Sequence, residues 1–195
     1  LLCPKHFFNS NFKQFLRLIE EKIYSGKLKN AFESVDEFVR IANEVLNRRK
    51  SRAGKSLEHH LSELFSKNDL VFEEQALTEG KKRPDFLFPN SSCYHNFEFP
   101  AKDLVVLGAK TTCKDRWRQV LSEADRVEEK YLFTLQQGIS LSQLKEMSDA
   151  KLTLIVPKPY IQSFPKAYQN QLKDLSEFIG IVKRRQDNIP KHYLI

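Results

Sequence analysis

Residues 104–135 read LVVLGAKTTCKDRWRQVLSEADRVEEKYLFTL, and they carry the main indication of the class of fold. The run 104–110 is almost continuously apolar, which is typical of a strand buried on both faces. From 114 to about 130 apolar side chains recur at helical spacing, and residues 131–135 return to a strand pattern. A strand, a helix and a strand in this order predict a right-handed crossover between two parallel strands.

The neighbouring segments extend this unit into a larger sheet. Upstream, residues 70–75 and 84–88 are short and β-prone, and they predict two more strands in a meander. Downstream, the pattern predicts a helix over 140–149, a buried strand over 151–156 and a last amphipathic helix over 168–183. The sequence therefore predicts an α/β fold with a mixed central sheet flanked by helices on both faces.

The first third of the chain has a helical pattern. Residues 1–32 predict an N-terminal arm or a short helix. Ser34 and Glu37 form a capping box that opens a helix, and Gly54 precedes a second helix that begins at about Ser56. We expect all 195 residues to form a single domain.

Composition excludes several classes of protein. With 41% apolar residues and 6 glycines the chain is neither disordered nor of low complexity, and we expect no membrane partner because no apolar run could cross a bilayer. Three widely spaced cysteines indicate reduced thiols and a cytoplasmic setting. A net charge of +7 favours an acidic partner, and nucleic acid is the commonest.

Charged residues gather where the strand 104–110 ends, and ligands commonly bind at the carboxyl ends of parallel strands. Lys110 closes this strand, and Asp85 follows Pro84 at the start of the strand one meander earlier. We expect Asp85 and Lys110 to meet, with Glu123 on the flank of the predicted helix and pointing toward them. Each residue alone also fits a structural role, as a turn aspartate, a snorkelling lysine or a solvated glutamate.

Together, Pro84-Asp85, Lys110 and Glu123 resemble the PD-(D/E)xK nuclease signature. The usual acidic residue two positions before the lysine is here Gly108, so the second carboxylate comes from elsewhere. It comes from the following helix in restriction endonucleases of the group that includes EcoRII, PspGI, SsoII and NgoMIV. The chain is most similar to the C-terminal catalytic domain of the EcoRII type. This resemblance implies a restriction-endonuclease-like fold and one endonuclease catalytic domain over residues 1–195.

The resemblance implies a Mg²⁺-dependent reaction. Asp85 and Glu123 would be the metal ligands, and Lys110 would orient the attacking water and offset phosphate charge. It also implies catalytic roles for Glu58, on the helix before the sheet, and for the hydroxyl of Tyr94. Taken alone, Glu58 reads as a solvated helix carboxylate and Tyr94 as a half-buried ring.

Basic residues near these positions are candidates for contacts with DNA. Lys114, Asp115 and Arg116 open the predicted helix, and the resemblance assigns them to reading C and G bases. Arg and Lys can donate to guanine O6 and N7, and Asp can accept from the cytosine amino group. Candidate contacts with the DNA backbone are Arg118, Arg52, Lys55 and Arg83. A solvated, charged helix start explains the same segment without DNA.

The resemblance implies a type II site-specific deoxyribonuclease that cuts double-stranded DNA at CCWGG, before the first C, and leaves 5′-phosphates. It further implies a homodimer on a two-fold site, flipping of the central bases, a prokaryotic cytoplasm and an upstream effector DNA-binding domain ahead of Leu1. Two alternatives stay open. One is a repair-type PD-(D/E)xK nuclease without sequence preference, and the other is a noncatalytic DNA-binding domain that uses the same basic surface.

Overall fold

The computed structural model describes residues 10–29, 32–113 and 116–194, and it contains two compact units that meet at the Ser51–Arg52 junction. Each unit is described separately below. The expectation of a single domain stays a prediction. None of the described helices has the length and apolar character needed to cross a bilayer.

The first unit consists of helix α1 (Ser10–Lys29) and the beginning of helix α2 (Val35–Ser66). Ion pairing between Arg49 and Glu20, with nitrogen and oxygen 2.6 Å apart, joins the two helices. Ser34 Oγ accepts from the backbone N–H of Glu37 at 3.1 Å, which confirms the predicted start of α2. The segment expected to be an arm or short helix is a helix of 20 residues.

The prediction of two helices divided at Gly54 is wrong, because α2 runs without a break for 32 residues. A glycine inside a helix costs about 1 kcal/mol relative to alanine. Beyond Gly54 the helix buries Leu57, Leu61 and Phe65, and this packing outweighs the cost of the glycine.

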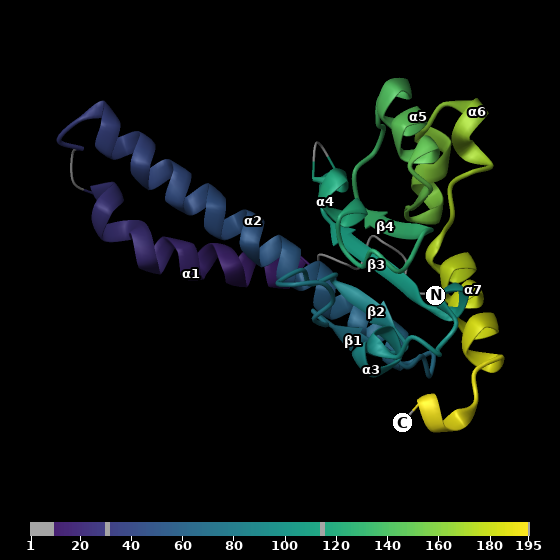
Figure 1. Ribbon diagram of the computed structural model, residues 1–195. Helices are drawn as coiled ribbons and strands as arrows, with labels where there is room; N and C mark the ends of the chain where they lie inside the picture. The colour runs from purple at the N-terminus through teal and green to yellow at the C-terminus, as the bar shows by residue number, and fades with distance from the viewer. Residues whose placement is uncertain (1–9, 30–31, 114–115, 195) are drawn as a thin grey trace. The chain divides into compact units, whose positions relative to one another are not determined.

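The second unit is built on a five-stranded sheet in the order β1-β2-β3-β4-β5, shown in teal and green in Figure 1. The strands are β1 (Glu73–Glu74), β2 (Phe86–Phe88), β3 (Val105–Lys110), β4 (Lys130–Thr134) and β5 (Leu152–Ile155). The first three are antiparallel, whereas β3, β4 and β5 run parallel, with Lys110 opposite Thr134. This arrangement confirms both the meander and the crossover.

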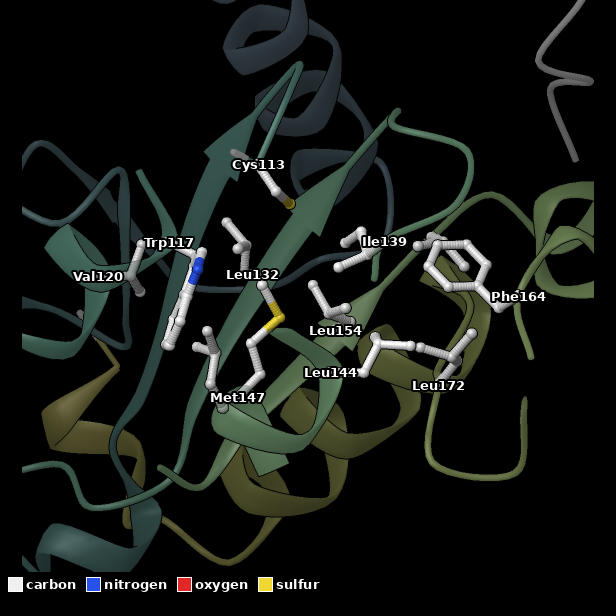
Figure 2. Close-up of a cluster of buried hydrophobic side chains, with 12 residues drawn as sticks. Cys113, Trp117, Val120, Leu132, Ile139, Leu144, Met147, Leu154, Phe164 and Leu172 are labelled. Atoms are coloured by element: carbon white, nitrogen blue, oxygen red, sulfur yellow. The ribbon is translucent and has the colours of Figure 1, made fainter. Parts of the chain in front are cut away.

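Helices cover both faces of this sheet. On one face Phe65 of α2 packs against Phe86 and Phe88 of β2 and against Phe178 of α7 (Leu175–Asp187), with ring centroids 5.2 to 5.9 Å apart. On the other face α4 (Trp117–Leu121) and α5 (Leu141–Asp149) bury their apolar side chains against β4 and β5, as Figure 2 shows. The α/β architecture with helices on both faces is therefore confirmed.

The helix predicted over 114–130 is wrong in extent, because α4 ends at Leu121 and residues 122–129 form turns and bends. Ala124 lies in the left-handed region, with φ 57°, and a helix cannot pass through that conformation. Glu123 is therefore in a turn after α4 and not on a helix.

The last helix also differs from the prediction over 168–183. Residues 166–169 form the short helix α6 (Lys166–Gln169), and Lys173 then makes a parallel bridge to Ile155 beside β5. Asp174 and Glu177 form a capping box that starts α7 afresh. The remaining short elements are α3 (Ser91–His95) and turns of 3-10 helix at Ala101–Asp103, Lys158–Ser163 and Lys191–Tyr193.

Candidate active site

Asp85 and Lys110 meet at the end of β3, as their positions in the meander and crossover predict. Asp85 is buried, and its Oδ2 accepts from Lys110 Nζ at 2.6 Å and from the backbone N–H of Ala109 at 2.7 Å. Gln75 Nε2 donates to the other oxygen, Oδ1, at 3.1 Å. Two charge-assisted contacts on Oδ2 and one bond to Oδ1 hold the carboxylate in place and still leave Oδ1 an acceptor position.

Gln75 is a site residue that has no signal in the sequence. It follows β1 with φ 51°, and its backbone N–H donates to the carbonyl of Asp85 at 3.2 Å. Arg83 Nη1 in turn donates to the carbonyl of Gln75 at 3.1 Å. These contacts depend on how β1 and β2 pair, and no local pattern reports such pairing.

Glu123 lies within electrostatic range of this pair. Burial, followed by the negative charge of Asp85, raises the pKa of Glu123 to about 7, while the positive charges of Lys110 and Lys130 act in the opposite direction. Its Oε2 atom is buried and has no hydrogen-bond partner among the residues that the structure describes. A buried, unpaired carboxylate oxygen next to a second carboxylate is a place where a cation would be stabilised.

Gly108 explains why the second carboxylate does not stand two residues before the lysine. A Cβ atom added at Gly108 would lie 2.5 Å from Val120 Cγ2 and 3.4 Å from Leu132 Cδ1. Figure 2 shows Val120 in the cluster under α4. Because α4 packs directly on β3 here, an acidic side chain at 108 would collide with Val120.

Glu58 also senses the charge of the site. It lies on the part of α2 that belongs to the second unit, and burial, then the charge of Asp85, raises its pKa, against an opposing effect of Lys110. The structure therefore brings together Asp85, Lys110, Glu123 and Glu58. Glu58 comes from α2, Asp85 from the position directly before β2, Lys110 from the end of β3 and Glu123 from the turn after α4.

The two carboxylates of Asp85 and Glu123 match the donor set that Mg²⁺ commonly uses in proteins. Within the described part of the chain, no group of three or more His, Cys, Asp or Glu side chains could hold a metal ion. Mg²⁺ commonly keeps several waters and uses one or two carboxylates together with phosphate oxygens of the substrate. Asp85 and Glu123 provide that number of carboxylates.

The Tyr94 hydroxyl forms hydrogen bonds outside the group of Asp85, Lys110, Glu123 and Glu58. The Tyr94 hydroxyl donates to Glu79 Oε1 and accepts from the backbone N–H of Arg126 at 3.2 Å. Burial and the hydrogen bond to Glu79 raise the pKa of Tyr94 well above its ordinary value. This environment keeps the phenol protonated and bonded to Glu79, and the catalytic role expected for its hydroxyl stays a prediction.

The residues expected to read bases are only partly described. Lys114 and Asp115 lie outside the described residues, and Arg116 is exposed at the N-terminal end of α4. The loop before them is tied to the loop after β4, because Gln136 Oε1 accepts from the backbone N–H of Cys113 at 2.8 Å.

The four expected backbone contacts lie on several elements. Arg118 of α4 stacks over Trp117 at 4.7 Å and pairs with Glu146 of α5 at 2.6 Å. Arg52 and Lys55 are on α2, half-buried and exposed respectively, and Arg83 is exposed just before the buried Pro84-Asp85 step.

Similarity to known proteins identifies the family of the chain. The profile of one protein family, EcoRII C terminal, matches residues 16–179. The chain is 49% identical over 174 residues to the type II restriction enzyme EcoRII of Escherichia coli, an alignment that covers 89% of this chain and 43% of that protein. The chain thus spans less than half the length of that relative.

Two solved restriction endonucleases have the same fold. A structure of metal-depleted Ecl18kI in complex with uncleaved, modified DNA has a TM-score of 0.73 at 19% identity, over 93% of this chain and 69% of that one. A complex of the restriction endonuclease PspGI with substrate DNA has a TM-score of 0.69 at 16% identity, over 92% of this chain and 76% of that one. With the matching family profile and the PD-(D/E)xK-like fold of restriction endonucleases, the chain belongs to the EcoRII C-terminal family.

Proposed function

We propose that this chain is the catalytic part of a Mg²⁺-dependent type II restriction endonuclease that hydrolyses both strands of double-stranded DNA. One observation carries the proposal: the buried Asp85 carboxylate, held by Lys110 at 2.6 Å, lies within electrostatic range of Glu123, whose buried Oε2 has no hydrogen-bond partner among the described residues. The 49% identity to EcoRII supports the same activity.

Asp85 and Glu123 are the residues that would hold Mg²⁺. Bound Mg²⁺ would supply activation of a water molecule and neutralisation of charge at the scissile phosphate. Asp85 is already oriented by Ala109 N–H and Gln75, so little rearrangement is needed before it binds a cation. Lys110 would orient the attacking water and offset the negative charge of the phosphate, and Glu58 would tune the charge of the site.

For the target sequence we propose CCWGG, cut before the first C, with 5′-phosphate ends. Lys114, Asp115 and Arg116 would read the C and G bases from the start of α4, because their donors and acceptor match the major-groove edges of a G·C pair. Flipping of the central pair would accommodate A or T in the middle. Contacts with phosphates would come from Arg118, Arg52, Lys55 and Arg83.

A two-fold target places one scissile bond in each strand, so we propose that two copies of the chain act together as a homodimer. The enzyme would act in the prokaryotic cytoplasm, where the buried thiols of Cys93 and Cys113 stay reduced.

The test is to incubate the purified protein with plasmid DNA that contains CCWGG sites and to map every cut end by sequencing. Parallel reactions contain Mg²⁺, EDTA, or Mg²⁺ with a plasmid whose CCWGG sites are replaced by CCSGG. Double-strand cuts at CCWGG in Mg²⁺ alone would support the proposal. Scattered nicks would indicate a repair-type nuclease, and tight salt-sensitive binding without any cut would indicate a noncatalytic DNA-binding domain.

A further inference from the structure

Glu123 lies in the turn after α4, and one backbone hydrogen bond joins it to that helix. Helix α4 ends at Leu121, the backbone N–H of Glu123 donates to the carbonyl of Val120 at 3.2 Å, and the next residue, Ala124, has φ 57°. A non-glycine residue in this region is kept there only where surrounding contacts impose it, at a cost of about 1 to 3 kcal/mol. The contacts that fix the chain after Glu123 therefore lie outside α4.

Side chains from two other segments hold the two residues after Ala124. Glu79 Oε1 accepts from the backbone N–H of Asp125 at 3.1 Å, and the Tyr94 hydroxyl accepts from the backbone N–H of Arg126 at 3.2 Å. The Tyr94 hydroxyl also donates to Glu79 Oε1. One continuous chain of hydrogen bonds thus fixes the backbone N–H groups of Asp125 and Arg126, shortly after Glu123 in the chain.

Arg126 ties the same turn to α3 through its side chain. Its guanidinium group donates to the carbonyls of Cys93 at 3.4 Å, Asn96 at 3.0 Å and Phe99 at 2.8 Å, and also to that of Tyr94. These carbonyls lie at and beyond the C-terminal end of α3, where a cation is favoured. Backbone and side chain of Arg126 therefore attach the turn to α3.

The segment that leads to Asp85 is joined to the same network. Glu79 precedes Asp85 by a short turn in which the backbone N–H of Lys82 donates to the carbonyl of Glu79 at 3.0 Å. Lys82 Nζ also lies 3.2 Å from Asp125 Oδ2. Two elements that carry the proposed metal ligands are thus linked by polar contacts that do not involve the ligands themselves.

We propose that Glu79, Tyr94 and Arg126 form a clamp that sets the separation between the carboxylates of Asp85 and Glu123. The three are positioning residues, since each acts through the turn at 124–126 and not on the substrate. The inference rests on the proposed function, because it concerns the metal site of that reaction. Removing a residue that orients a metal ligand typically lowers metal affinity or activity by about 10- to 100-fold.

The test uses Tyr94→Phe, which removes only the hydroxyl, and Glu79→Ala beside Glu79→Gln, which keeps an acceptor oxygen. Tyr131→Phe is the matched control, because Tyr131 is also a buried tyrosine but its hydroxyl lies beside Glu129 and not in the clamp. Four properties are measured: single-turnover cleavage, the KM for DNA, DNA binding in EDTA, and Mn²⁺ binding without DNA by the electron paramagnetic resonance of free Mn²⁺.

We expect Tyr94→Phe and Glu79→Ala to lower kcat by about 10- to 100-fold and to weaken Mn²⁺ binding by about 10-fold, with the KM and DNA affinity within about 3-fold of wild type. Glu79→Gln should recover most of the loss, and Tyr131→Phe should behave as wild type. Wild-type kcat and Mn²⁺ affinity in both clamp variants would overturn the inference. Loss of both DNA binding and cooperative urea unfolding in these variants would overturn it too, since the network would then support only the fold.

The two proposals fail in different ways. If the wild-type protein binds Mn²⁺ but cuts no DNA, the proposed function is wrong, while the Mn²⁺ affinities of the variants still decide whether the clamp sets the metal site. If the wild-type protein cuts DNA and Tyr94→Phe cuts equally well, only the clamp is wrong.

Discussion

Replacing Glu123 by Gln should stabilise the protein at alkaline pH and leave its stability unchanged at acidic pH. Burial and the charge of Asp85 raise the pKa of Glu123 from 4.5 to about 7 in the folded state. Between these two values the folded protein holds a proton that the unfolded chain has released, so the free energy of unfolding falls as the pH rises. The amide of Gln does not titrate and avoids this loss.

The size of the effect follows from the difference in pKa. One pKa unit corresponds to about 1.4 kcal/mol, so the penalty well above pH 7 amounts to at most about 3.5 kcal/mol. Glu123 is only partly buried, and water that reaches the carboxylate reduces the penalty. We therefore expect Glu123→Gln to gain about 1 to 3 kcal/mol at pH 8.5 and close to nothing at pH 4.5.

Urea unfolding without divalent cations measures this difference, with fluorescence of the single, buried Trp117 as the probe. Glu63→Gln is the control, because Glu63 is an exposed helix carboxylate paired with Lys67. An equal gain at pH 4.5 and pH 8.5, or a loss at pH 8.5, would refute the reasoning. Mg²⁺ at ten times its dissociation constant should then stabilise the wild type by about 1.4 kcal/mol and the variant by much less.

Four further substitutions test separate parts of the site. Asp85→Ala should abolish cleavage of plasmid DNA in Mg²⁺ while binding in EDTA, followed by fluorescence anisotropy, persists; full cleavage would remove Asp85 from the site. Lys110→Arg should lower the single-turnover rate at least about 100-fold, because a planar guanidinium does not replace a compact ammonium beside Asp85. Arg116→Ala should weaken binding to a cognate duplex by about 1 to 3 kcal/mol and bind a noncognate duplex almost unchanged; equal losses on both would make it a phosphate contact. Gly108→Ala should cost about 1 to 3 kcal/mol in urea unfolding, since the new Cβ would lie 2.5 Å from Val120, and Val120→Ala in the same chain should recover part of that cost.

The sheet was the most predictable part of the fold. Periodicity located the three strands that pair in parallel, because a doubly buried strand must be apolar at nearly every position. The helix boundaries were less predictable. Gly54 does not end α2, since buried residues on the same helix outweigh its cost. Helix α4 ends at Leu121, shortly before Ala124 takes φ 57°, although alanine is the best helix former.

The site was predictable only where topology determines it. A meander followed by a crossover places Asp85, directly before β2, beside the end of the adjacent strand β3 that Lys110 closes, so their contact follows from the order of elements. Glu123 was identified by the resemblance to the nuclease signature. It reaches the site from a turn, so helical spacing could not predict its position. Gln75 and Glu79 carry no local pattern, because the contacts that give each of them its role appear only once distant segments pack together.

The close approach of Val120 to Gly108 has a consequence for how such active sites diverge. A carboxylate on β3 and a carboxylate in the turn after α4 are alternative solutions, and the first requires the volume that Val120 fills. A single acidic substitution at 108 meets a steric barrier, and loss of Glu123 alone removes a proposed metal ligand before another exists. Passage between the two forms of the motif therefore requires coordinated changes at three positions, an epistatic barrier that would keep a lineage in the form it already has.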